Sequence, residues 1–154
     1  MDNEALAILR QLVLGQRVMS LAVLVDGEPV VGLLPFALSA DRRGLVVHAS
    51  SLARHTKGLA DGRPFDALVH AQDAPDIDPL QIPRVTLRGN VRLLESSSPE
   101  YASDREAYLT RFPEAEPIMS FDDFRLFRLE IAAGRVVLGF ARAINVGRDV
   151  LEKL

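Results

Sequence analysis

The sequence has no cysteine, only three histidines and no long apolar run, and each of these scarcities excludes a class of protein. Without cysteine there can be no disulfide, no thiolate metal ligand and no cysteine nucleophile. No segment approaches the roughly 20 apolar residues of a membrane span, and the acidic start MDNEALAIL differs from the basic start of a secretory signal. We therefore expect a soluble, cytoplasmic protein that does not interact with a membrane.

Neither acidic nor basic residues are in large excess, because the net charge at pH 7 is only -3. Such a balance gives no general reason to expect a nucleic acid as the partner. The length of 154 residues and the 48% hydrophobic content are typical of one globular domain. We expect a single domain over residues 1–154 whose ligands are small molecules.

Recognisable catalytic motifs are absent as well. The sequence contains no HExxH, GxSxG, Walker loop or GxGxxG. His48 and His70 lie in apolar segments, which is more typical of histidines in a barrel wall than of ligands. The aspartates lack calcium-loop spacing, so no metal site is expected. If the protein is an enzyme, a bound cofactor must carry the reaction.

The most informative segment present is residues 44–59, GLVVHASSLARHTKGL. Its pattern predicts a strand that ends at two serines and a helix over residues 52–59 with Ser51 as its N-cap. The start of such a helix favours an anion, and hydroxyl and basic side chains surround it, as a phosphate monoester requires. The side chains in question are Ser50, Ser51, Arg54, His55, Thr56 and Lys57. An ordinary capped surface helix would carry the same residue types, so composition alone leaves both interpretations open.

The rest of the chain predicts an antiparallel barrel. Helices are expected from residue 2 or 3 to 15, over 99–111, and from about 145. An Ala132-Ala133-Gly134 turn is expected to join the last two strands, and Pro35 indicates an edge or a bulge. Alternation over residues 84–95 places three arginines on one face, which either line an anion groove or face solvent. The expected strands are 18–25, 30–38, 45–47, 65–71, 84–95, 124–131 and 135–141.

Five blocks of sequence resemble one known family. They are SSLARHTKGL, DPLQIPRVTLRGNVRLLE, YLTRFP, DFRLF and GFARA, in this order, within residues 14–146. Together they resemble the FMN-binding split-barrel proteins related to pyridoxamine 5′-phosphate oxidase, in the branch that contains the haem-utilisation proteins. The resemblance implies a mainly β (α+β) fold, a six-stranded antiparallel split β-barrel with a few flanking helices. It also implies a homodimer that holds FMN in a groove between its subunits.

The resemblance also assigns residues to the cofactor. Arg84 matches the arginine that begins the family's long strand, and Arg142 lies in the block that closes the flavin groove. Gly58 replaces the asparagine of the family's HTxNL block, which removes a hydrogen-bonding side chain. The phosphate side of the cofactor site would consist of Ser50, Ser51, His55, Thr56 and Lys57. Deazaflavin is an alternative cofactor, because related split barrels use it.

Three functions follow as hypotheses. The first is an FMN-dependent oxidoreductase that takes electrons from a nicotinamide or another small reductant, with its substrate and catalytic residues unidentified. The second is a non-catalytic flavin or small-ligand binding protein. The third is haem handling, against which the sequence argues, because the family's haem-utilisation members have a histidine in a longer carboxyl-terminal part and no histidine follows His70 here. Vitamin B6 oxidation is not implied, because the substrate residues of the oxidase itself are not matched.

Overall fold

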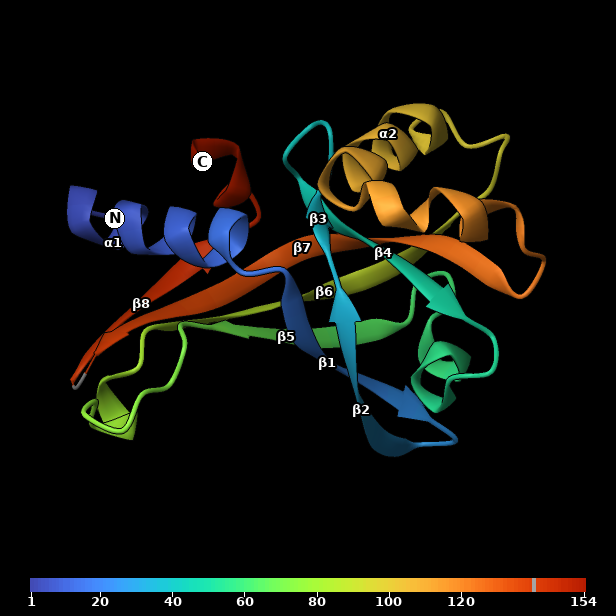
Figure 1. Ribbon diagram of the computed structural model, residues 1–154. Coiled ribbons are helices and arrows are strands. Elements are labelled where there is room, and N and C mark those ends of the chain that lie inside the picture. The colour runs from blue at the N-terminus through green and yellow to red at the C-terminus, as the bar shows by residue number, and fades with distance from the viewer. Residues whose placement is uncertain (140) are drawn as a thin grey trace.

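The computed structural model describes residues 1–139 and 141–154, and these form one antiparallel sheet of eight strands (Figure 1). Phe140, which belongs to the GFARA block, lies outside the described residues. The strands run in the order β2-β1-β5-β6-β7-β4-β3, and β8 pairs with β7. They are β1 (Val18–Val25), β2 (Glu28–Pro35), β3 (Ala37–Leu38), β4 (Gly44–Ser50), β5 (Pro64–His70), β6 (Arg84–Leu94), β7 (Phe124–Gly139) and β8 (Arg142–Gly147). The predicted mainly β split barrel with flanking helices is confirmed, but its sheet has eight strands in the described residues and not the expected six, because β3 and β8 add two short strands.

The barrel is split between β2 and β3, the two ends of the strand order. Phe36 alone separates these strands in sequence, and its side chain is fully buried. The chain itself thus joins the two edge strands, β2 and β3, at the place where backbone hydrogen bonds between them would be needed to close the barrel. Pro35 ends β2, an edge strand, as expected for a residue that cannot donate to a ladder.

The predicted turn at Ala132-Ala133-Gly134 is wrong, because β7 continues through it as one long strand. β7 pairs with β6 along most of its length, with β4 in its first half and with β8 in its second half. A Cβ on Gly134 would lie 2.6 Å from the carbonyl oxygen of Thr86, so the glycine allows close approach of β6 rather than a turn. The helix predicted from residue 145 is also wrong, because β8 extends to Gly147 and only the turn η5 (Leu151–Lys153) follows.

Two helical units flank the sheet (Figure 1). The first is α1 (Asn3–Arg10), which continues as the π-helical η1 (Gln11–Gly15). Asp2 is the N-cap of α1, because its carboxylate accepts a hydrogen bond from the Ala5 N–H at 2.8 Å. The second is α2 (Tyr101–Arg111), followed by the 3-10 helix η4 (Pro113–Ser120). α2 begins two residues later than predicted, because Ser98 accepts a hydrogen bond from the Glu95 N–H and does not cap the helix.

Side chains are buried on both faces of the sheet. One cluster fills the barrel under α1 and η1, with Leu12 and Leu45 among its fully buried members. A second cluster lies under α2 and η4, where Val46 packs with Tyr108 and Phe112. β4 contributes to both clusters, which explains why its residues from Gly44 to Ala49 are all buried. None of the helices in the described residues is long and apolar enough to cross a membrane.

Candidate functional site

The two serines lie where β4 ends, beside the start of β7. The Ser50 hydroxyl accepts a hydrogen bond from the Leu52 N–H at 3.2 Å. The Ser51 N–H donates to the carbonyl oxygen of Asp123 at 2.7 Å, which ties this turn to the segment before β7. The Ser51 side chain is exposed and has no hydrogen-bond partner in the described part of the chain. The strand that ends at two serines is therefore present as predicted.

The helix predicted over residues 52–59 is not. The segment instead forms η2 (Arg54–Gly58), a five-residue 3-10 helix that has Ala53 at its N-cap and no side-chain cap. The Ser50 hydroxyl binds the Leu52 N–H in a tight turn, so Ser51 does not act as the N-cap. A helix this short has too few aligned peptide groups for a useful dipole. The helix dipole expected from the sequence is therefore not available to a phosphate here.

Gly32 and Gly58 let η2 pack closely on the β1–β2 hairpin. The His55 ring lies directly over Gly32, at a position where any Cβ would collide with Nδ1. A Cβ on Gly58 would lie 2.7 Å from Val23 Cγ2, so an asparagine would not fit there without displacing η2. Burial lowers the pKa of His55, which leaves its imidazole neutral at pH 7. The ring of His55 thus packs against the hairpin.

Thr56 and Lys57 each have a polar group without a partner in the described residues. The Thr56 hydroxyl oxygen is buried without a hydrogen-bond partner, a situation that costs about 1–3 kcal/mol. Lys57 is exposed, and its ammonium has no ion-pair partner among the described residues. A phosphate accepts hydrogen bonds and attracts cations, so these groups fit the phosphate of a flavin mononucleotide. We call Ser50, Ser51, His55, Thr56 and Lys57 the strand-end group.

Arg84 and Arg142 are the first residues of β6 and β8. Figure 1 shows that these two strands begin at the end of the sheet away from η2. Arg84 begins β6 and donates from Nη1 to the Ile82 carbonyl oxygen at 3.0 Å. Arg142 begins β8 and forms ion pairs with Asp2 at 3.0 Å and Glu4 at 2.7 Å. Both line a hollow of about 410 Å³, which we call the arginine hollow; its other lining residues are Leu80, Arg135, Val137, Gly139, Ala141 and Ala143. One chain alone does not bring the seven predicted cofactor residues together.

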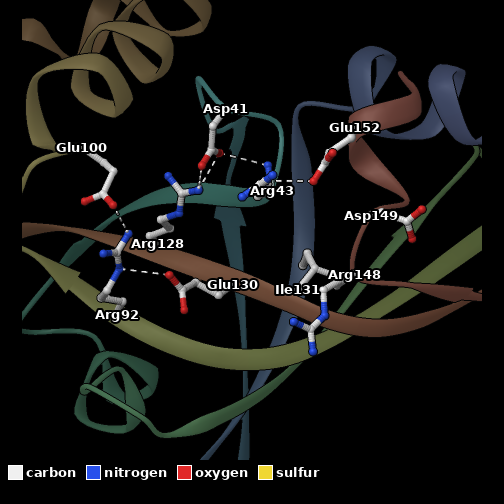
Figure 2. Close-up of a pocket in the computed structure, with 10 residues that line it drawn as sticks. All are labelled: Asp41, Arg43, Arg92, Glu100, Arg128, Glu130, Ile131, Arg148, Asp149 and Glu152. Carbon is white, nitrogen blue, oxygen red and sulfur yellow. Dashed lines mark hydrogen bonds and ion pairs between the residues drawn. The ribbon is translucent and has the colours of Figure 1, made fainter.

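Sequence reasoning missed a charged cavity of about 450 Å³ beside α2 (Figure 2). At its wall Arg128, whose side chain is 4% exposed, forms ion pairs with Asp41 and with the fully buried Asp104 at 2.8 Å. Burial raises the pKa of Asp41, but hydrogen bonds from Arg128 and Ser39 outweigh it and lower the pKa overall. Arg128 lies in the buried run Leu126–Leu129 of β7, yet no local signal identifies its partner 24 residues away on α2.

The charges of this cavity largely satisfy one another. Figure 2 shows Arg92 between Glu100 and Glu130, at 3.1 Å from each, and Arg43 bound to Glu152 at 2.8 Å. These ion pairs join β6, β7, the start of α2 and the carboxyl-terminal turn. We interpret the cavity as a structural junction and not as a second ligand site.

No family model matches the sequence, and no curated protein matches it either. Solved structures do match. A haem-binding protein from Mycobacterium smegmatis superposes with a TM-score of 0.82 at 25% identity, covering 98% of this chain and 61% of that chain. This chain thus spans less than two thirds of that relative's length.

Two further neighbours share the fold. An FAD- and haem-binding protein from Mycobacterium smegmatis has a TM-score of 0.64 at 19% identity, covering 95% of this chain and 82% of that chain. A Clostridium acetobutylicum protein of the pyridoxinephosphate oxidase family, related to general stress protein 26 of Bacillus subtilis, has a TM-score of 0.67 at 14% identity, with each chain covered completely.

Proposed function

The chain has the split-barrel fold of the family related to pyridoxamine 5′-phosphate oxidase, with haem-binding proteins among its structural neighbours, and from this premise we propose that it is an FMN-binding oxidoreductase. The single observation that carries the proposal is that two neighbouring residues of η2 have polar groups without partners among the described residues. They are Lys57, through its ammonium, and Thr56, through its buried hydroxyl. A cation and free hydroxyls at one strand end suit a phosphate monoester. The absence of cysteine accords with action in the cytoplasm.

Three residues of the strand-end group have distinct roles in this proposal. Lys57 neutralises phosphate charge, and the Ser51 hydroxyl donates a hydrogen bond to a phosphate oxygen. Ser50 holds the turn in place, because its hydroxyl is already bound to the Leu52 N–H. The flavin, when bound, supplies the electron-transfer chemistry between a small reductant and an acceptor.

A homodimer completes this site. On the outward face of the β1–β2 hairpin, Val31 and Leu33 are each 68% exposed, and Val18 and Leu24 flank them. Exposed apolar side chains clustered on a strand face are typical of an interface, and a second copy of the chain is the partner we propose. Two such sheets facing each other would bring the strand-end group of one copy toward the arginine hollow of the other. Arg84 and Arg142 would then close the flavin site from the partner subunit.

The decisive experiment is an absorbance spectrum from about 300 to 700 nm after incubation with excess FMN and desalting. Retained flavin bands that bleach on anaerobic addition of a nicotinamide reductant would establish the oxidoreductase. Bands that persist but never bleach would replace it with a non-catalytic flavin carrier. A colourless protein would refute FMN binding, and a parallel incubation with deazaflavin would show whether that cofactor takes its place.

Haem handling is a second candidate function, favoured by the haem-binding protein that matches 98% of this chain. Its test is independent of the flavin experiment, because ferric haem has its own absorption band. Titration of the protein with haemin should shift and sharpen the Soret band. An unchanged haemin spectrum at saturating protein would eliminate this function.

A further inference from the structure

The three arginines on one face of β6 differ in what surrounds their guanidinium groups. Arg92 lies between two carboxylates, at 3.1 Å from each. Arg84 donates a hydrogen bond to the Ile82 carbonyl oxygen. Arg88, which lies midway between them in sequence, has no ion pair and no side-chain hydrogen bond with any described residue. Arg88 is therefore the arginine of this face whose whole guanidinium group is open to an anion.

Arg88 lines a hollow of about 230 Å³ on the sheet, which we call the Arg88 hollow. On one side, Arg88 lies directly opposite Asp66 of β5. On the other side, Arg135 of β7 lies opposite both Thr86 of β6 and Asn145 of β8. Side chains of directly opposite residues point to the same face of a sheet. The lining residues are Asp66, Thr86, Arg88, Gly134, Arg135 and Asn145.

Several polar groups of this hollow have no partner. Arg135 donates from Nη1 to the side-chain oxygen of Asn145 at 2.8 Å, which leaves the Asn145 amide nitrogen and the other Arg135 nitrogens as donors. Opposite charges that face each other across two strands usually pair. Asp66 and Arg88 nevertheless form no ion pair, and Asp66 has no other side-chain partner in the part of the chain that the structure describes.

The chemistry of a matching ligand follows from these groups. The guanidinium groups of Arg88 and Arg135 carry two positive charges, and a phosphate monoester carries nearly two negative ones. Its three terminal oxygens can accept hydrogen bonds from Arg88, Arg135 and Asn145 together. The Asp66 carboxylate repels a phosphate but accepts a hydrogen bond from a hydroxyl of the same ligand. A sugar phosphate has both groups a short distance apart.

The Arg88 hollow adjoins the arginine hollow, because Arg135 lines both. In the proposed dimer, Arg84 of the arginine hollow closes the flavin site from the partner subunit. A ligand in the Arg88 hollow would therefore lie beside the flavin.

We propose that the Arg88 hollow binds a sugar phosphate, free or as part of a nucleotide, with the phosphate on Arg88 and Arg135 and a sugar hydroxyl on Asp66. The role of this ligand as a substrate of the flavin rests on the proposed function. Its binding does not, because every group that would hold it belongs to the Arg88 hollow.

Isothermal titration calorimetry of the purified full chain tests the binding. Ribose 5-phosphate represents a free sugar phosphate and adenosine 5′-monophosphate a nucleotide, and the tighter binder of the two identifies the source. Inorganic phosphate and ribose each supply one half of the ligand, so both should bind more weakly than ribose 5-phosphate. The strand-end group also suits a phosphate, so each titration is repeated with Lys57→Ala, which should still bind ribose 5-phosphate.

Two variants should separate the two halves of the ligand. Arg88→Gln should weaken ribose 5-phosphate and inorganic phosphate about tenfold or more, because charge-assisted hydrogen bonds are lost. Asp66→Ala should weaken ribose 5-phosphate but not inorganic phosphate, since it removes the acceptor for the hydroxyl and a repulsive charge. Arg63→Gln, an exposed arginine outside the hollow, is the matched control and should behave as wild type. Circular dichroism of each variant shows that the fold is retained.

Three results would overturn the proposal. They are a wild-type protein that binds none of the phosphorylated probes, an Arg88→Gln variant that binds ribose 5-phosphate as wild type does, and binding that Lys57→Ala abolishes. The third result would place the phosphate on the strand-end group. A protein that retains no FMN but binds ribose 5-phosphate with the expected pattern of variants would refute the proposed function and leave the Arg88 hollow as a binding site.

Discussion

Lys57 is the exposed cation of the strand-end group, and its effect should be measurable directly. Lys57→Ala should weaken FMN binding by about 1–3 kcal/mol, the scale of a charge-assisted hydrogen bond. Fluorescence titration of FMN gives the dissociation constant. Arg63→Ala, which removes an exposed cation between η2 and β5, should leave it unchanged. Equal losses in both variants would mean that only general charge attracts the cofactor.

Gly58 departs from the family block for a steric reason that the sequence does not reveal. Gly58→Ala should destabilise the fold by roughly 1–3 kcal/mol, because its Cβ would lie 2.7 Å from Val23 Cγ2 and 2.8 Å from the Leu24 carbonyl oxygen. Urea denaturation measures the free energy of unfolding. Gly15→Ala is the control, since its Cβ would meet nothing closer than 4.0 Å. A Gly58→Ala variant as stable as wild type would show that η2 can move.

His48 makes stability depend on pH. Burial lowers the pKa of His48 below its ordinary 6.5, so the unfolded chain takes up a proton first as the pH falls. Stability is therefore fully present above pH 6.5 and decreases below it. His48→Phe should reduce this decrease between pH 7 and 5, although the lowered pKa of His55 preserves part of it. Urea midpoints at the two pH values provide the test, and an unchanged slope would contradict the assignment.

At the scale of elements, Arg111 joins α2 to the end of η1. Its guanidinium donates to the carbonyl oxygens of Val13 at 3.0 Å and Leu14 at 3.2 Å, and also to that of Gln16. It also lies over the Phe36 ring, 4.9 Å from the centroid. The carbonyls at the end of a helix have no partner within it, so a side chain from another element satisfies them here.

Arg111→Ala should therefore destabilise the protein by about 1.5–3 kcal/mol, the range for hydrogen bonds that involve a charged group. Thermal or urea unfolding would measure the loss. Arg105→Ala on the same helix removes only a surface ion pair with Glu116 and should cost up to about 1 kcal/mol. If the two variants were equally stable, the contacts of Arg111 with η1 would be energetically unimportant.

Element boundaries were predictable where the signal is local. The residues of β1 match the apolar run 18–25 completely, and Asp2 caps α1 as its side chain predicts. β7 was divided wrongly because Ala132-Ala133-Gly134 has the composition of a turn, while its extended conformation is imposed by pairing with β6 and β8. Small residues allow a turn and a close strand contact equally, and only the neighbouring strands decide between them.

At the scale of the whole molecule, the outward face of the β1–β2 hairpin should determine the oligomeric state. Leu33→Asp should convert a dimer into a monomer, because it places a charge among exposed apolar side chains. Light scattering after gel filtration measures the mass. Ile77→Asp, on an exposed loop outside the hairpin, is the control. A wild-type monomer would refute the dimer, and a dimeric Leu33→Asp variant would place its interface elsewhere.

The strand-end group could be predicted from sequence because its members lie within eight residues of one another. Its geometry could not, because the conformation of η2 depends on close contacts of Gly58 with β1 and of His55 with Gly32 on β2. The relation of His70 to Arg84 was equally hidden, since 14 positions separate them and only the register of β5 on β6 makes them neighbours.

Periodic apolar residues, caps and turns act over a few positions, so the sequence by itself determined the mainly β class, most strands and the segment that carries Lys57. Strand register and side-chain packing act between residues far apart in the chain. Only the tertiary structure could therefore decide that β7 is continuous, that Arg128 pairs with the buried carboxylate of Asp104, and that Arg84 and Arg142 line the same hollow.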